Sequence, residues 1–170
     1  MKTHTSVHRV IVFSVWVWCA LIVLAPFLSG SEGLAKLAGG GLYKFFGEIC
    51  HQNNARTIHW GGGPLAVCAR CTGIYGGFAV GILLFSVRNK WTGAMSHRRT
   101  IVVGALPMLV EVVAEIARLT EAGNAIRCST GALFGLSLSA VLVALLVEAT
   151  ETLAQKTLLR FHHVKGPTPA

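Results

Sequence analysis

Four apolar segments set the limits on how this chain of 170 residues can fold. They cover residues 10–28, 65–87, 100–117 and 126–147. About 20 apolar residues cross the hydrocarbon core of a bilayer as an α-helix, because each residue adds about 1.5 Å. Hydrophobic residues make up 53% of the chain and charged residues only 13%, which is too apolar for an ordinary soluble domain. We therefore expect an all-α membrane protein, built as a bundle of about four transmembrane helices.

The segments outside these spans are short. Residues 1–9 form a polar tail, and residues 10–147 hold all four expected spans. We interpret the first span as retained, because it is longer than the apolar part of a signal peptide and lacks a small-residue cleavage site. A short interfacial helix is expected over residues 42–49, followed by a cysteine-rich loop, and Pro64 is expected to open the helix of the second span. Residues 148–170 are expected to form an amphipathic tail.

The formal net charge of +8 comes from basic residues that flank the apolar segments. They are not interleaved with stacking aromatic residues, so we expect no nucleic-acid partner. The loop after the second span carries Arg88, Lys90, Arg98 and Arg99. Because basic loops stay in the cytoplasm, we expect a multi-pass protein of the bacterial inner (cytoplasmic) membrane with both termini cytoplasmic. The lipid bilayer is then its expected partner.

In this orientation, three cysteines and a histidine gather at the outer face. Cys68 and Cys71 form a C-x-x-C pair, and Cys50 and His51 precede them in the outer loop. Thiolate and imidazole groups bind zinc and other transition metals, so these four residues predict a transition-metal site of zinc type. His59 or a water molecule is an alternative fourth ligand.

The same cysteines also fit a redox site. A C-x-x-C pair on an oxidising face supports thiol–disulfide exchange, with Cys68 and Cys71 as the redox pair. Cys50 or Cys128 would then relay electrons to a thiol protein at the outer face. Simple buried thiols are a third interpretation, so the residues alone leave open whether this protein is an enzyme.

Ionisable residues also occur within the third span. Glu111, Glu115 and Arg118 are spaced by four and three residues, which places them on one helical face. Charges inside a span are costly and often mark a proton or ion pathway, which suggests a small ion-coupled transporter. The alternative is structural, with Glu115 paired to Arg118 or to Arg127.

Three arginines are expected at the outer face, near the cysteines. They are Arg56, Arg70 and Arg127, with the amides of Gln52 and Asn124 close by in the sequence. Together they predict a pocket for an anion, a lipid head group or the carbonyl of a quinone. Arginines at a helix end also anchor a protein at the interface, which is the simpler alternative.

Glycines recur at every fourth position in two of the spans. The second span has Gly73, Gly77 and Gly81, and the fourth has Gly131 and Gly135. Small residues at this spacing let two helices approach closely in lipid, where van der Waals contact drives association. We expect each of these spans to approach a neighbouring helix closely along its row of glycines.

Three motifs carry a resemblance to a known family. They are C-H-Q-N-N-A-R-T at residues 50–57, V-C-A-R-C-T-G-I-Y-G-G at 67–77 and N-A-I-R-C-S-T-G at 124–131. With them, the chain resembles a bacterial family of predicted integral membrane proteins of unknown function. The resemblance implies that the motif positions are Cys50, His51, Gln52, Arg56, Cys68, Arg70, Cys71, Thr72, Gly73, Tyr75, Asn124, Arg127 and Gly131. The family has Asp-Gly near the place where this chain has Glu111-Val112. The resemblance implies no particular activity, because the family's function is unknown.

The expected architecture is also similar to that of the disulfide-generating oxidase of the bacterial inner membrane. That enzyme has four spans, with an outward C-x-x-C at the top of the second. The similarity implies a quinone-linked thiol–disulfide oxidoreductase as an alternative to the metal site, with quinone as its cofactor.

Overall fold

The computed structural model describes residues 2–87 and 97–164, and most of these residues are helical. In chain order, its elements are α1 (Lys2–Ser29), α2 (Leu34–Gly47), the 3-10 turn η1 (Asn54–Arg56), β1 (His59–Trp60), β2 (Gly63–Pro64), α3 (Ala69–Val87), α4 (His97–Ile116) and α5 (Asn124–Val164). Apart from one antiparallel hairpin of two-residue strands, the described ranges contain no sheet, which confirms the helical class. Arg88 and Lys90 of the basic loop lie outside the described residues.

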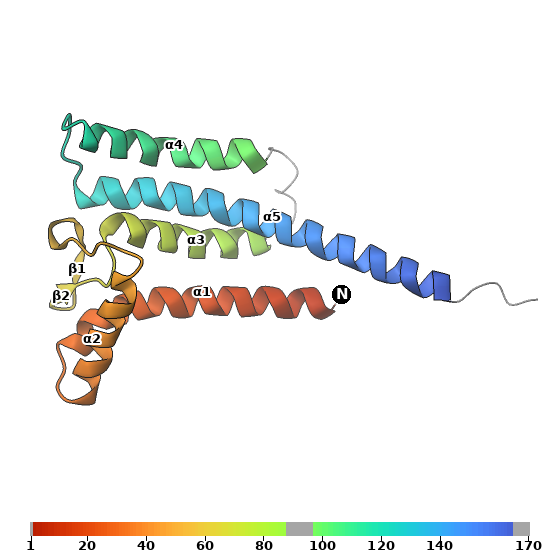
Figure 1. Cartoon of the computed structure of the whole chain (residues 1–170), viewed down its shortest axis with the longest axis horizontal. Helices are drawn as coiled ribbons and strands as arrows, with labels where there is room; N and C mark the ends of the chain where they lie inside the picture. Colours follow the sequence, from red (N-terminus) through yellow and green to blue (C-terminus); the bar gives the residue numbers. More distant parts are fainter. Residues whose placement is uncertain (1, 88–96, 165–170) are drawn as a thin grey trace, which may run out of the picture.

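The four long helices lie side by side in the order α1, α3, α5 and α4 (Figure 1). α3 packs chiefly on α5, α4 packs on α5, and α1 packs on α2 and α3. α2 and the hairpin lie together at the end of this row opposite the N-terminus, which we call the loop end. α5 extends beyond the other helices at the far end of the row.

Two of the described helices are long and apolar enough to cross a bilayer. They are α1 over residues 9–29 and α5 over residues 124–146, whereas the apolar part of α3 is shorter, over residues 69–84. Phe13 on α1 is 70% exposed and Val103 on α4 is 62% exposed. Apolar side chains left open in this way fit helices that face lipid.

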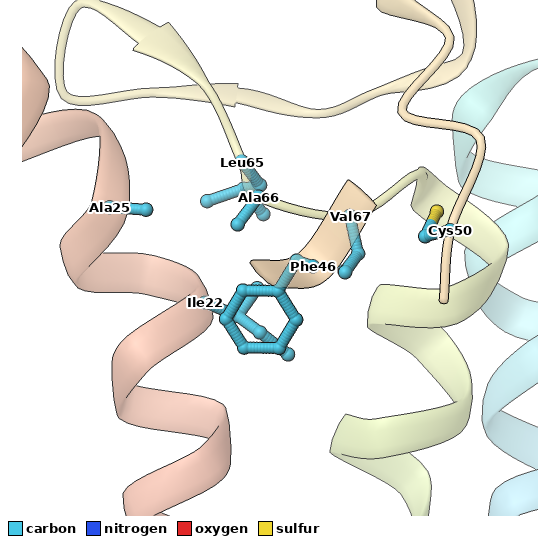
Figure 2. Close-up of a cluster of buried hydrophobic side chains, with 7 residues drawn as sticks. All are labelled: Ile22, Ala25, Phe46, Cys50, Leu65, Ala66 and Val67. Atoms are coloured by element: carbon cyan, nitrogen blue, oxygen red, sulfur yellow. The ribbon is translucent and has the colours of Figure 1, made fainter. Parts of the chain in front are cut away.

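An apolar core joins α1, α2 and the segment that leads into α3 (Figure 2). Its buried members are Ile22, Ala25, Phe46, Cys50, Leu65, Ala66 and Val67. Trp18 of α1 lies against this core, edge to face with Phe46 and Tyr75 at ring-centroid distances of 5.2 and 5.8 Å. Cys50 belongs to the core, so the core fixes the start of the cysteine-rich loop.

The start of the second expected span differs from the structure. α3 begins at Ala69, and Pro64 lies in β2, so the prediction that Pro64 opens this helix was wrong. The Leu65 N–H donates a hydrogen bond to the Ile58 carbonyl at 2.8 Å, and the Tyr43 hydroxyl donates to the Pro64 carbonyl. These bonds hold the chain in an extended conformation after the hairpin, so that α3 begins only at Ala69.

Two other helices are longer than the segments expected for them. α2 begins at Leu34, directly after Gly33, whose φ of 64° ends the preceding turn. Gly33 suits this place because a residue without Cβ adopts positive φ at no steric cost. The tail expected from residue 148 continues α5 without a break to Val164.

Glycines allow α3 and α5 to approach closely. A Cβ atom added to any of five residues would collide with the opposite helix: Gly73, Gly77, Gly81, Gly131 and Gly135. At Gly77, the added atom would overlap the carbonyl oxygen of Ala132. The backbones therefore touch along this interface, and no larger residue fits without separating the helices.

We predict that Gly77→Ala lowers the stability of the detergent-solubilised protein by about 1–3 kcal/mol, because the added methyl group overpacks the interface. Gly76→Ala is the matched control, since Gly76 is exposed and an added Cβ there has no neighbour within 4 Å. That control is expected to be neutral, or to stabilise by up to about 1 kcal/mol through helix propensity. Thermal unfolding monitored by circular dichroism checks this, and equal melting temperatures for the two variants would contradict it.

Candidate functional site

Three cysteines come together at the loop end. The Sγ atoms of Cys50, Cys68 and Cys71 all lie within 4.8 Å of one another and could hold a metal ion. Cys50 follows α2, where its N–H donates to the Phe46 carbonyl at 2.9 Å. Cys68 immediately precedes α3 and Cys71 lies in its first turn. The Cys68 N–H donates to the Cys50 sulfur at 3.2 Å, which links the two ends of the loop.

Gln52 bends the loop back toward α3. Its backbone φ is 43°, in the left-handed region that a residue other than glycine rarely adopts. Its side-chain amide donates to the carbonyls of Tyr43 and Ala66, both at 2.7 Å. One side chain therefore connects α2, the loop and the segment before α3, and it brings Cys50 to Cys68.

The other predicted ligands lie outside the three-sulfur group. His51 and His59 are exposed, and the His59 Nδ1 lies 3.2 Å from the Thr57 carbonyl. Cys128 lies on α5, where its carbonyl packs against Gly73. The described structure thus joins three of the four predicted metal ligands and leaves His51 at the surface.

The Cys68 thiol has an unusually low pKa. Hydrogen bonding with the Cys71 thiol stabilises the Cys68 thiolate, the backbone N–H groups of Cys71 and Arg70 add to this, and together they lower the pKa to about 5 against the opposing effect of burial. The N-terminus of α3 lies directly beside it, and the helix dipole favours a negative charge there. At neutral pH Cys68 is therefore a thiolate, which is the form that binds metals and attacks disulfides.

A network of ion pairs lies beside the cysteines, between α3, α4 and α5. Arg70, between Cys68 and Cys71, donates to both Glu111 oxygens, from Nε at 3.1 Å and from a terminal nitrogen at 2.6 Å. The same terminal nitrogen donates to Glu115 at 3.1 Å. Glu111 is 8% exposed, so its charge is stabilised chiefly by Arg70.

Two further arginines complete this network. Arg127 of α5 donates to Glu115 at 2.8 Å and to the Asn124 side chain at 3.3 Å. Arg56 of η1 lies 2.9 Å from the same Glu115 oxygen. The Asn124 amide also donates to the Thr57 carbonyl at 3.3 Å, so the network fastens the cysteine-rich loop to α5.

Arg118 takes no part in the network. It is exposed and has a φ of 56°, and the Leu119 N–H donates to the Ala114 carbonyl at 2.9 Å. This bond, together with that from the Arg118 N–H to the Glu115 carbonyl at 3.1 Å, forms the Schellman motif that ends α4.

Arg56, Arg70 and Arg127, which the sequence suggested for a pocket, therefore pair with Glu111 and Glu115, which it suggested for an ion pathway. The pair of Glu115 with Arg127 was one of the two structural alternatives, and the pair of Glu115 with Arg118 does not form. Sequence reasoning missed the pairing of Arg70 with Glu111, which are 41 residues apart. It also missed the Tyr43 hydroxyl that holds Pro64. Neither contact has a local sequence signal, because each depends on which helices lie next to one another.

We predict that Glu111→Gln lowers the free energy of unfolding by about 3 kcal/mol, because the partly buried Arg70 and Arg127 then have Glu115 as their one remaining carboxylate partner among the described residues. Glu121→Gln, at an exposed position in the α4–α5 turn, is the control and is expected to change it by less than about 0.5 kcal/mol. Thermal unfolding in detergent measures both, and equal stability of the two variants would show that the network adds nothing.

The low pKa of Cys68 predicts how its alkylation depends on pH. In chelator-treated protein, the rate of Cys68 modification by iodoacetamide should rise through pH 5 and level off above it, as the thiolate forms. Cys71→Ala removes the main stabilising partner and should shift the midpoint toward about 8.5, the value of a free cysteine. Mass spectrometry of the modified peptide gives the rates. A midpoint near that of a free cysteine in the unsubstituted protein would rule out the stabilised thiolate.

Comparison with known proteins agrees with the membrane character of the chain. Residues 50–141 match the family model described as "Predicted membrane protein (DUF2085)". An uncharacterized protein of Methanocaldococcus jannaschii, MJ1492, is 29% identical over 140 residues, which cover 75% of this chain and 85% of the relative. An uncharacterized protein of Methanothermobacter thermautotrophicus is 34% identical over 95 residues, which cover 55% of this chain and 84% of the relative. No solved structure matches the chain.

The matched region begins at Cys50 and ends on α5, so it contains the three cysteines and the whole ion-pair network. Both relatives are archaeal, so similar chains are not confined to bacteria. The family match covers more than half of the sequence. The chain therefore belongs to the DUF2085 family of predicted membrane proteins.

Proposed function

We propose that this membrane protein binds a transition metal ion of zinc type at its loop end, through the thiolates of Cys50, Cys68 and Cys71. The observation that carries the proposal is the mutual approach of the three Sγ atoms within 4.8 Å. Three sulfur ligands suit zinc, copper(I) and iron, which prefer soft donors.

A three-cysteine site leaves one coordination position to fill. Structural zinc sites have four protein ligands, whereas sites that act on a substrate keep one position open. His51 follows Cys50 directly and is the candidate for the fourth ligand, with a water molecule as the alternative. The Cys68 N–H bonded to the Cys50 sulfur would support the site by orienting that ligand.

We further propose that α1, α3, α4 and α5 all cross the membrane. The 19 residues of α3 and the 20 residues of α4 give lengths of about 28 and 30 Å, close to the hydrocarbon thickness of a bilayer. Both termini would be cytoplasmic, in the inner membrane if the host is bacterial, and the loop end would face outward.

A second candidate function is quinone-linked thiol–disulfide exchange, favoured by the Cys68 thiolate beside Cys71 at the start of α3. Cys68 and Cys71 would lose two electrons and two protons as their disulfide forms. A quinone would gain both and become the hydroquinone. A thiol protein at the outer face would then reduce the disulfide and become oxidised itself.

The decisive experiment is the metal content of the full-length protein, purified in detergent without a metal-affinity column and measured by mass spectrometry. A metal site predicts about one zinc, copper or iron per chain, lost in Cys50→Ser and in Cys68→Ser. Cys128→Ser and Cys19→Ser are matched controls and should keep the metal, because neither residue belongs to the three-sulfur group.

The same measurement separates the two candidate functions. Unsubstituted protein without metal, with Cys68 and Cys71 joined in a disulfide, would reject the metal site and support exchange. His51→Ala tests the fourth ligand: a lower affinity in chelator competition identifies His51, and an unchanged affinity assigns the position to water.

A further inference from the structure

α2 carries a row of apolar side chains that are open to the surroundings of the molecule. Leu34 and Leu37 are 82% and 73% exposed, and Phe45 and Ile49, which follows the helix, are about half exposed. Steps of three and four residues, through Gly41, place these positions on one side of the helix, which we call the apolar side. Large apolar side chains gathered on one exposed side mark a surface that contacts a protein or a membrane.

The other sides of α2 have different surroundings. Gly39 and Phe46 are buried, and a Cβ atom added to Gly39 would lie 2.5 Å from the backbone nitrogen of Ser29, so this side packs on the end of α1. Lys36 and Lys44 are exposed on a third side, which we call the basic side. An exposed apolar side next to an exposed basic side is the pattern of a helix that lies in the plane of a membrane surface.

The length and direction of α2 agree with this position. Its 14 residues make a helix about 21 Å long, which is too short to cross a hydrocarbon core of about 30 Å. It lies across the direction of the four long helices, at the loop end (Figure 1). Because the apolar stretch of α1 at residues 9–29 is long enough to cross a bilayer, a helix placed across the end of α1 runs along the bilayer surface.

A ring contact shows which side of α2 points toward the bilayer. The Phe45 ring meets the Trp18 ring edge to face at a centroid distance of 5.7 Å. Trp18 lies inside the apolar stretch of α1, well before its end at Ser29, so Phe45 points toward the membrane interior. Lys36 lies about two and a half helical turns before Phe45 and is therefore on the opposite side of α2. Lysine is depleted where two proteins pack together, whereas anionic lipids attract it, so the basic side favours lipid over a protein partner.

We propose that α2 binds the surface of the membrane leaflet at the loop end, with Leu34, Leu37 and Phe45 among the acyl chains and Lys36 and Lys44 at the lipid phosphates. The apolar side then replaces water by lipid, and the basic side stays hydrated beside the head groups. This inference goes beyond the metal site and does not depend on it, but it rests on the proposal that α1 crosses the membrane.

The lipid contact extends beyond the segment 42–49 that the sequence suggested as interfacial, because the apolar side begins at Leu34. At its other end, Ile49 directly precedes Cys50. α2 therefore also sets the depth of the three-sulfur group and holds it near the level of the membrane surface.

The test uses the full-length protein, labelled with fluorotryptophan, in nanodiscs of phosphatidylcholine and phosphatidylglycerol. Leu34→Trp adds one fluorine NMR resonance on the apolar side, and Lys36→Trp, the matched control, adds one on the basic side of the same helix. A lipid with a nitroxide high on its acyl chain should broaden the resonance at position 34 until its intensity is lost. A water-soluble gadolinium chelate should leave that resonance intact, and the resonance at position 36 should respond in the opposite way.

Two results would overturn the proposal. A resonance at position 34 that is lost with the chelate and kept with the nitroxide lipid would mean that α2 stands clear of the membrane. A resonance that both probes leave intact would mean that a partner protein or a second copy of this chain covers the apolar side. Phe45→Trp, on the same side, repeats the measurement if Leu34→Trp does not fold.

Trp16 distinguishes a failure of this proposal from a failure of the membrane-crossing α1. It is 45% exposed within the apolar stretch of α1, and Trp16→Phe assigns its resonance. A lipid with a nitroxide at the end of its acyl chain should broaden the Trp16 resonance if α1 crosses the bilayer. Broadening at Trp16 without broadening at position 34 would overturn the lipid contact of α2 alone, whereas a Trp16 resonance left intact would overturn both. Cys68→Ser should change neither result, because the lipid contact does not need the metal.

Discussion

The buried pair of Arg70 and Glu111 is the interaction on which the arrangement of the loop end depends. A carboxylate that is 8% exposed near lipid is tolerated only if a cation meets it with good geometry, and two nitrogens of Arg70 do so. Because Arg70 lies between Cys68 and Cys71, the same contact that pairs the charge of Glu111 also fixes the turn that carries two of the three sulfurs. The position of these two thiols at the start of α3 therefore depends on α4, whose Glu111 lies 41 residues after Arg70.

The distribution of charge in the network explains how it fits so near the membrane. Arg70 and Arg127 are largely buried and are matched one for one by Glu111 and Glu115, so the buried part is formally neutral. The remaining positive charge is on Arg56, whose side chain is 48% exposed and therefore hydrated. Water solvates the unpaired charge of Arg56, and the charges buried in the protein are those that have a partner of opposite sign.

The apolar segments predicted the helical class, and the C-x-x-C with Cys50 predicted where the thiols gather, because both signals are local in the sequence. The start of α3 was missed because the Tyr43 hydroxyl, far upstream, holds Pro64 in a hairpin. The partner of Arg70 was missed for a related reason. Helical periodicity gives the face on which Glu111 lies, but the neighbour of that face depends on the order of the helices in the row, which no short pattern encodes.

The uninterrupted course of α5 has a mechanical consequence. Its 41 residues make a rod about 62 Å long, of which residues 124–146 are apolar enough for the bilayer. Its first turn carries Arg127 in the ion-pair network, and its glycines pack against the backbone of α3. The first part of this rod packs on α3 and α4, and the later part extends beyond them, so a change in how α5 packs on its neighbours is carried as a displacement to its protruding end.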